Sequence, residues 1–222
     1  MRLNRRDVLL ATAALILASL CVRAGSCQLD RLGQRRARNA AVAARLALPP
    51  LNVGRETSPD SARQRRLVAR GTYDFARERV WRLRSFDGTP GVALITPLRL
   101  ADGSAVFVDR GWVPSPDAYH VDQALYREPD TATVEGLGIT PPRGRDDVVP
   151  GALRDSLPYP LVPFIVQQTG TSAPRGLPRR WPAPAADDGP HLSYAIQWFS
   201  FALIIVLGTG ALLRKTTILG HF

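Results

Sequence analysis

The feature that most constrains this chain is an uncharged stretch that runs from Leu192 to Leu213. At the rise of an α-helix it would be roughly 33 Å long, which is enough to cross the hydrocarbon core of a bilayer. Two aspartates and a proline in residues 187–190 precede it, as is typical of the start of a helix. Arg214-Lys215 follow it and suit a cytoplasmic membrane face. We therefore predict a transmembrane helix over residues 191–213.

The first turns of this predicted helix carry aromatic and polar side chains. Tyr194 and Trp198 suit the aromatic belt at a membrane surface. Ser193, Gln197 and Ser200 fall on one helix face, because they are spaced by four and then three residues. A polar stripe inside a membrane usually packs on another protein element. We expect it to face either the first apolar segment of the chain, described next, or a partner protein.

That first apolar segment, Val8–Val22, follows a tail that contains Arg2, Arg5 and Arg6. The residues alone leave two interpretations open. The segment is short for a membrane span, and paired arginines before it with small residues at 24–26 after it are typical of a cleavable signal. The alternative is an uncleaved transmembrane helix whose Arg23 reaches toward the lipid headgroups. The positive-inside rule would then place both chain ends in the cytoplasm and the middle outside.

The sequence between the two apolar segments indicates mainly β-structure. A helix-prone stretch, residues 28–48, ends at Pro49-Pro50, and strands are predicted at 67–73, 79–84, 91–98, 105–108, 132–137 and 161–168. Asp102-Gly103 between two apolar runs predicts an antiparallel hairpin from Gly91 to Val113, in the centre of the sheet. Pro163 predicts that the last strand lies at an edge. The predicted fold class is an α+β membrane protein in which two transmembrane helices flank an antiparallel, barrel-like β-rich domain.

Composition narrows the classes of function. The formal charge is +10 and Lys215 is the only lysine, but the arginines are dispersed and no nucleic-acid motif accompanies them. We therefore expect the lipid bilayer as a partner and no nucleic acid. Cys21 and Cys27 form no CxxC or zinc spacing, which leaves a two-thiol copper site as an alternative. Because no nucleophile group or phosphate loop is recognisable, we expect no enzyme.

Several stretches together resemble the surfeit locus protein 1 family, whose members are assembly factors for haem–copper terminal oxidases. The most specific are residues 105–114, AVFVDRGWVP, and residues 189–199, GPHLSYAIQWF. Residues 25–31, 66–73 and 91–98 resemble further family segments in the same order, except that Cys27 stands where the family typically has tryptophan. The resemblance implies two membrane helices and so favours an uncleaved span at residues 8–22.

The resemblance implies a multi-pass protein of a bacterial plasma membrane with both termini in the cytoplasm. The boundaries that we predict are cytoplasmic tails at 1–7 and 214–222, transmembrane helices at 8–24 and 191–213, and an extracytoplasmic β-rich domain at 25–190. Its implied role is cytochrome c oxidase biogenesis, with haem a as a transient cofactor. The implied partners are the oxidase large subunit and other assembly factors. Two alternatives stay open: a structural chaperone of the large subunit without a cofactor, and a copper-delivery protein.

The implied cofactor site centres on His191, whose neutral imidazole would ligate the haem iron. Tyr194 and Trp198, at helical spacing from it, would line the ring. Arg110 would bind the propionates, because its planar fork suits carboxylates. The alternative roles are a helix-capping residue for His191, membrane-surface anchors for the two aromatics, and a salt bridge for Arg110 with Asp109 or another carboxylate. His120 is expected to be solvated, and His221 lies at the end of the sequence.

Overall fold

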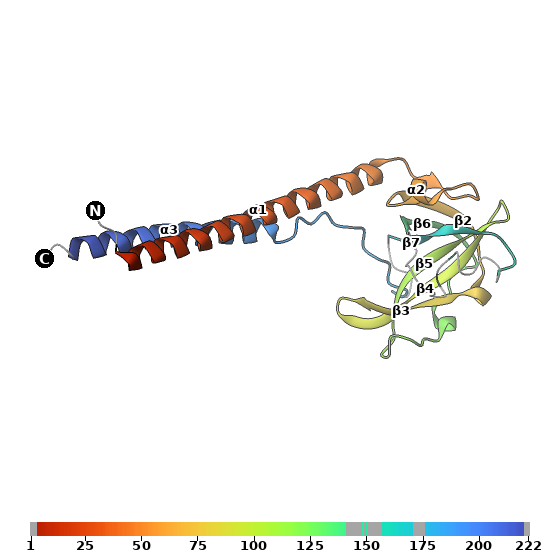
Figure 1. The fold of residues 1–222 in the computed structure, drawn as a ribbon. Coiled ribbons are helices and arrows are strands. Elements are labelled where there is room, and N and C mark those ends of the chain that lie inside the picture. The colour runs from red at the N-terminus through yellow and green to blue at the C-terminus, as the bar shows by residue number, and fades with distance from the viewer. Residues whose placement is uncertain (1–3, 141–147, 149, 151–156, 171–175, 220–222) are drawn as a thin grey trace. The chain divides into compact units, whose positions relative to one another are not determined.

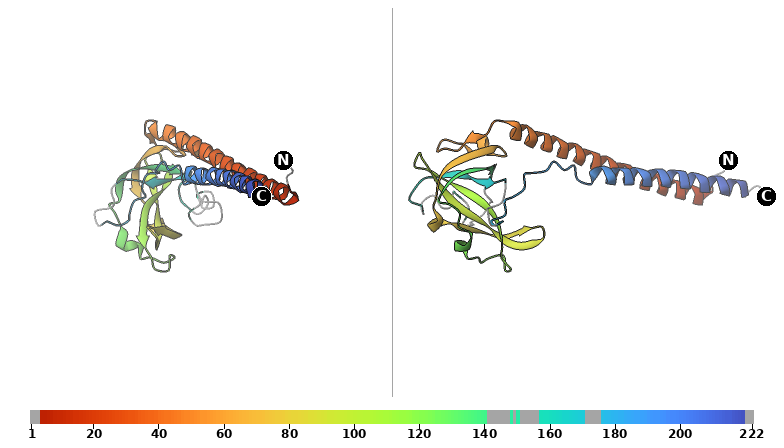
Figure 2. Two further views of the ribbon diagram at one scale, coloured as in Figure 1. Left: turned by 90° about the vertical axis from the view of Figure 1, so that its left-hand side faces the viewer. Right: turned by 180° about the vertical axis from the view of Figure 1, so that it is seen from behind.

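A computed structural model describes residues 4–140, 148, 150, 157–170 and 176–219, with side chains up to Lys215. The chain divides into two compact units (Figures 1 and 2). The helical unit consists of residues 1–41 and 186–222, and the β unit consists of residues 42–185.

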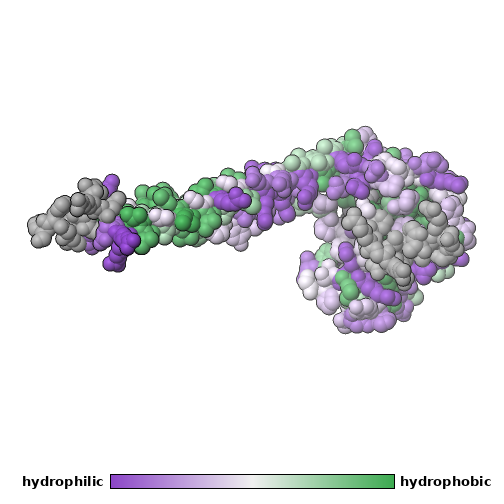
Figure 3. Space-filling view, viewed as in Figure 1, coloured by the Kyte–Doolittle hydropathy of each residue, from purple (hydrophilic) through white to green (hydrophobic). Residues whose placement is uncertain are grey.

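The helical unit is built from two long helices, α1 (Arg5–Ala47) and α3 (His191–Leu219). The first apolar segment and the helix-prone stretch after it therefore form one continuous helix of 43 residues, rich in the strong helix formers Ala, Leu and Arg. It ends before Pro49-Pro50, because the residue before a proline disfavours helical geometry. Among the described residues, these two helices are long and apolar enough to cross a membrane. Figure 3 shows hydrophobic residues gathered over one part of the helices and hydrophilic residues along the stretch that follows it.

α1 and α3 pack along a seam with a seven-residue repeat, which we call the heptad seam. The least exposed positions of each helix recur at alternating intervals of three and four residues. On α1 they are Ala11, Ala14, Ala18, Cys21, Gly25, Gln28, Leu32 and Asn39, and on α3 they are His191, Ala195, Trp198, Ala202, Ile205 and Thr209. Ala18, Cys21 and Ala202 form its buried centre. A 3.5-residue period is that of a left-handed coiled coil. The two helices run antiparallel, because Cys21 packs with Ala202 whereas Gln28, later in α1, contacts His191, earlier in α3.

Gly25 leaves room on α1 for the ring of Phe199 of α3. A Cβ atom at this position would lie 2.9 Å from the ring of Phe199. We expect Gly25→Leu to push the helices apart, with an overpacking cost of about 1–3 kcal/mol. The measurement is thiol cross-linking between Cys21 and a cysteine placed at Ala202, with Cys27 replaced by serine.

Gly33→Leu is the matched control, because a Cβ there would meet nothing within 4 Å. Cross-linking should fall in the Gly25→Leu protein and stay at the parent level in the control. Equal yields in both proteins would contradict the close approach at Gly25.

The β unit contains a seven-stranded sheet in the order β1-β2-β6-β7-β5-β4-β3. Because β2 also pairs with β4, the pairings close a ring through β2, β6, β7, β5 and β4. The predicted strands are all present. The elements are β1 (Leu51–Asn52), α2 (Pro59–Ala62), β2 (Arg66–Tyr73), η1 (Phe75–Arg77), β3 (Arg79–Phe86), β4 (Thr89–Leu100), β5 (Ala105–Pro114), η2 (Gln123–Tyr126), β6 (Thr131–Ile139) and β7 (Leu161–Gln168).

The predicted central hairpin is confirmed. β4 and β5 pair antiparallel from Gly91↔Pro114 to Arg99↔Ala105. Gly103 adopts a positive φ of 79° in the turn between them, which only glycine adopts without strain. β4 also pairs with β2 and β3, and β5 also pairs with β7, so the hairpin lies inside the sheet.

Two details of the predicted sheet were wrong. The sheet is mixed rather than antiparallel, since β1–β2 and β5–β7 pair in parallel. The long connection through β6 between β5 and β7 makes that parallel pairing possible. Pro163 does not mark an edge, because β7 pairs with both β5 and β6. The β5–β7 register is irregular between the pairs at Leu161 and Ile165, and the β6 pairing begins only at Ile165, so the missing N–H of Pro163 disrupts no regular ladder.

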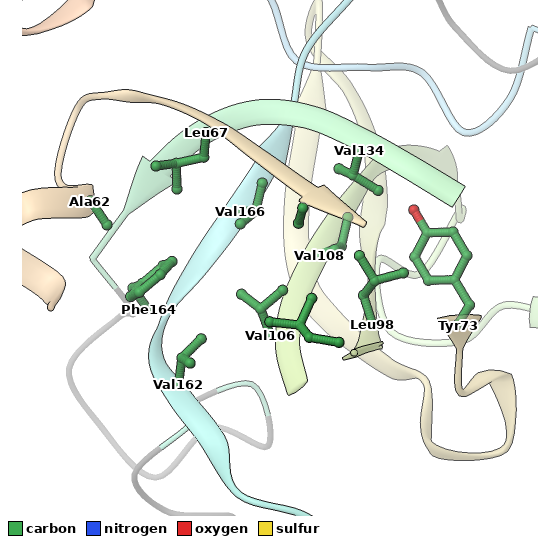
Figure 4. Packing of buried hydrophobic residues seen from close by; sticks show 12 residues of the cluster. Ala62, Leu67, Tyr73, Leu98, Val106, Val108, Val134, Val162, Phe164 and Val166 are labelled. Carbon is green, nitrogen blue, oxygen red and sulfur yellow. The ribbon is translucent and has the colours of Figure 1, made fainter. Parts of the chain in front are cut away.

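Alternate residues of the strands whose pairings close on themselves, β2, β6, β7, β5 and β4, fill the main core (Figure 4). Residues spaced by two along a strand point to one face, so each strand contributes a short series. The series are Leu67 and Ala69, Leu98 and Leu100, Val106 and Val108, and Val162, Phe164 and Val166, with Val134 beside them. The intervening residues of β4, β5 and β7 (Ala93, Ile95, Phe107 and Ile165) form a second cluster. Burial on both faces explains why these strands have nearly continuous apolar sequences.

Candidate functional site

The candidate site lies at the start of α3, where His191 meets Gln28 of α1. The Nδ1 atom of His191 lies 2.9 Å from the Oε1 atom of Gln28. An amide oxygen only accepts hydrogen bonds, so Nδ1 is the donor. In the neutral ring, the lone pair is then on Nε2. Among the described residues Nε2 has no hydrogen-bond partner, so it is available to a ligand.

The Nε2 edge of the ring faces Gly189. This glycine has a φ of 67°, in the region that favours glycine. A Cβ atom at residue 189 would lie 3.5 Å from Cδ2 and 3.7 Å from Nε2 of His191. The absence of a side chain therefore leaves the coordinating edge of the imidazole uncovered. An imidazole with one nitrogen held by a hydrogen bond and the other open fits the requirements of an iron ligand.

On one side of His191 lies a polar group of side chains, the arginine–aspartate cluster. Arg35 donates from Nε to the Asp187 carbonyl at 2.7 Å, and its Nη2 lies 3.3 Å from the Asp187 carboxylate. Arg36 Nε lies 2.8 Å from the Asp188 carboxylate. Asn39 donates to the Asp187 carbonyl at 3.0 Å. The cluster fixes the segment that leads into α3 against α1.

On the other side of His191, along α3, the side chains are small or aromatic. Ala195 is buried, and Trp198 is half-buried in the heptad seam with its ring at an edge-to-face angle to Phe201. Tyr194 is 47% exposed and does not face α1. Of the three helix residues predicted for the site, His191 and Trp198 share the seam face, and Tyr194 lies beside it.

The polar stripe of Ser193, Gln197 and Ser200 is exposed. Of the two neighbours expected for it, residues 8–22 are excluded, because the seam uses the opposite face of α3, the one that carries His191, Ala195 and Trp198. That leaves the second part of the expectation, a partner protein, as a prediction.

Arg110 belongs to the β unit and is fully buried in ion pairs. Its guanidinium lies 2.5 Å from Glu78 and 2.7 Å from Glu128, and it donates to Thr96 at 2.8 Å. Arg180 also pairs with Glu128. The salt-bridge interpretation of Arg110 is thus confirmed, with Glu78 and Glu128 as the carboxylates. We call Glu78, Arg110, Glu128 and Arg180 the buried ion network.

Asp109 points to the opposite face of β5, as the alternation of a strand requires. It accepts hydrogen bonds from the Gly111 N–H at 3.0 Å and from Gln167 at 3.4 Å. Its burial raises the pKa of the carboxyl group, because the charged form is desolvated. Sequence reasoning missed the partners Glu78, Glu128 and Arg180, although an arginine inside an apolar strand signals that buried carboxylates must exist.

The β unit also has a cavity of about 770 Å³, which does not include any predicted site residue. Its lining comes from residues 72–78 and 121–124, with Arg99 and Arg127. Arg77 and Arg127 are paired with Asp74 and Asp130 respectively. Four of its six charged lining groups already have ion-pair partners within the β unit, so we place the candidate site at His191 and not in this cavity.

The remaining cysteines and histidines do not form a metal site in the part of the chain that the structure describes. No group of three His, Cys, Asp or Glu residues is close enough to hold a metal ion there. Cys21 is buried in the heptad seam, whereas Cys27 is exposed, so the two thiols lie on different faces of α1. His120 is exposed as predicted and lies 2.6 Å from Asp117. His221 lies outside the described residues.

Comparison with known proteins gives one consistent result. A sequence model of the SURF1 family matches residues 15–203, a range that includes His191, Gln28 and the arginine–aspartate cluster. SURF1-like proteins of Mycobacterium bovis and of two strains of Mycobacterium tuberculosis are each 27% identical over 173 residues. The matches cover 70% of this chain and 62% of each relative. The chain thus spans less than two thirds of the length of these curated relatives.

Proposed function

The chain belongs to the SURF1 family, and on that premise we propose that it is a membrane assembly factor for a haem–copper terminal oxidase. Its proposed task is to hold haem a, or stabilise its insertion, while the oxidase large subunit matures. It would act by binding, as a chaperone together with other assembly factors, and not as an enzyme.

The observation that carries this proposal is the environment of the two ring nitrogens of His191. Gln28 holds Nδ1, and Gly189 leaves Nε2 open. Haem a, when bound, would supply an iron that accepts a nitrogen ligand. His191 would be its ligand, Gln28 would orient the imidazole, and Trp198 and Tyr194 would contact the apolar part of the ring. The propionates are not assigned to Arg110, because its guanidinium is buried between two carboxylates.

We propose a bacterial plasma membrane as the location, with α1 and α3 as the spans. Arginines at residues 5 and 6 and the basic pair Arg214-Lys215 flank the apolar segments. By the positive-inside rule both termini are cytoplasmic, and the β unit lies outside. The pairing of β2 with both β4 and β6 supports a barrel-like form for that unit.

The exposed polar stripe of α3 favours a second candidate function, a chaperone that binds the oxidase large subunit without a cofactor. Ser193, Gln197 and Ser200 face away from α1, and polar groups in a membrane helix commonly bond to a neighbouring helix. Such a protein would need the stripe and not the imidazole of His191.

The experiment that decides between these functions is purification of the full chain in detergent with haem a present. An absorption spectrum that differs from that of free haem a would support the cofactor-holding function. A protein that binds no haem a but co-purifies with the oxidase large subunit would support the cofactor-free chaperone and overturn the first proposal. Copper analysis of the same sample tests the copper-delivery alternative.

Gln28→Leu is expected to weaken haem a binding by roughly 10–100-fold, which is typical when the partner that orients a metal-binding histidine is lost. Without the amide oxygen, the His191 ring would lose its fixed tautomer. The second readout needs no haem: nitrogen NMR of the histidines should show the Nε2 lone pair in the parent and a tautomer mixture in the variant. The chain has only three histidines, so assignment is simple.

Gln197→Leu is the control for this prediction, since it makes the same change on the exposed face of α3. It should leave both the tautomer of His191 and the haem affinity as they are. A Gln28→Leu protein with the parent's tautomer would show that Gln28 does not position His191.

A further inference from the structure

The arginine–aspartate cluster contains two neighbouring guanidinium groups, each occupied by a carboxylate of the same chain. Arg35 pairs with Asp187 at 3.3 Å and Arg36 pairs with Asp188 at 2.8 Å. The side chains involved are between 45% and 68% exposed. Exposed ion pairs of this kind add little stability, so another carboxylate in the same place can replace Asp187 or Asp188 at small cost.

Arg35 is also close to the open edge of His191. The Cβ position of Gly189 lies 3.7 Å from the His191 Nε2 atom and 3.8 Å from the Arg35 Nε atom, so both nitrogens border the same space. Along α1, Arg35 is about two helical turns beyond Gln28, on the side away from the apolar segment at residues 8–22. A ligand held at Nε2 thus has guanidinium groups on one side and Trp198 on the other.

We propose that Arg35 and Arg36 form a binding site for the two carboxylates of the ligand that His191 holds, and that Asp187 and Asp188 occupy this site in the free protein. The ligand class is an iron macrocycle with two carboxylate groups and an apolar remainder. This inference rests on the proposed function, because it needs a ligand at His191.

The two aspartates then compete with the ligand for the same arginines. Guanidinium groups bind carboxylates through paired N–H donors, and this geometry is the same for an aspartate and for a propionate. When the ligand leaves, Asp187 and Asp188 re-occupy the arginines, so each guanidinium again has a carboxylate partner. The competition lowers the net affinity, which suits a protein that passes its ligand on.

The test compares two double variants that break the same ion pairs from opposite sides. Arg35→Gln with Arg36→Gln removes the site, so affinity for haem a should fall about tenfold, as for the loss of two exposed charge-assisted bonds. Asp187→Asn with Asp188→Asn removes the competitor, so affinity should rise about threefold. The measurement is titration of the full chain in detergent with haem a and, separately, with its dimethyl ester, which has no carboxylates.

Binding of the dimethyl ester should be the same in the parent and in both variants. Arg31→Gln with Arg38→Gln is the matched charge control, since these exposed arginines of α1 lie outside the cluster. Equal losses in the arginine and aspartate variants, or a loss that also affects the ester, would show that the ion pairs only pack the helices and would overturn the inference. Binding of haem a by the parent with no change in either variant would overturn it while leaving the proposed function intact. A parent that binds neither form would refute the proposed function itself.

Discussion

Replacement of Arg110 by methionine is expected to lower the free energy of unfolding of the β unit by roughly 3–5 kcal/mol, the usual cost of removing one partner from a buried ion pair. The guanidinium is fully buried, and it neutralises Glu78 at 2.5 Å and Glu128 at 2.7 Å. Methionine fills much of the volume, but it leaves Glu78 buried with no cation beside it. The measurement is denaturation of the full chain in detergent, followed by tryptophan fluorescence.

Arg99→Met is the control, because Arg99 is exposed on the neighbouring strand β4 and makes none of the ion pairs found in the described part of the chain. It should change stability by no more than about 0.5 kcal/mol. Adding Glu78→Gln to the Arg110→Met protein should recover part of the loss, since the uncompensated charge is then removed. Equal stabilities for the Arg110→Met and Arg99→Met proteins would show that the buried ion network contributes little.

The same comparison separates folding from cofactor binding. Arg110 lies in the β unit, and the contacts that it makes with described residues are with groups of that unit. An oxidase assembly defect in the Arg110→Met strain should therefore follow the amount of folded protein. A defect in a Gln28 or His191 variant should instead appear at normal protein levels.

Much of the β unit could be predicted from the sequence because its signals are local. The Asp102-Gly103 turn and the apolar runs beside it fix the β4–β5 hairpin, whose partners are close in sequence. The parallel pairing of β5 with β7 depends on the path of a long connection, which no local pattern reveals. The prediction that Pro163 marks an edge strand was wrong for a related reason. A register irregularity in the β5–β7 pairing accommodates this proline inside the sheet.

The heptad seam was missed because its residues are small rather than aliphatic. Ala18, Cys21 and Gly25 do not register as a hydrophobic stripe, although a seam of small residues lets membrane helices approach closely. The candidate site could be predicted only in part. His191 was found through the resemblance, but its partner Gln28 is 163 residues away in the sequence, and Asp187 is 152 residues from Arg35. Pairs at such separations arise only when the fold brings the helices together.

His191→Ala is expected to remove the spectral signature of an imidazole-ligated iron from protein purified with haem a. The alanine protein should still insert into the membrane, because the substitution leaves the apolar part of α3 unchanged. The affinity for haem a should fall only in part, although the spectral signature is lost. The apolar ring and tail of haem a would still favour an apolar environment by about 25 cal/mol per Å² of surface buried. Spectrum and haem content must therefore be measured on the same sample.

A glycine at residue 191 makes the test more specific, because it leaves space for a free imidazole. Added imidazole should restore the parent spectrum in the His191→Gly protein if iron ligation is the role of this side chain. His120→Ala is the control, since that imidazole is exposed and pairs with Asp117 in the β unit. If the His191→Ala protein keeps both the spectrum and the haem content of the parent, His191 serves only to begin α3 and bond to Gln28. The cofactor would then have to be assigned to other residues, and the cofactor-free chaperone would become the better account of this chain.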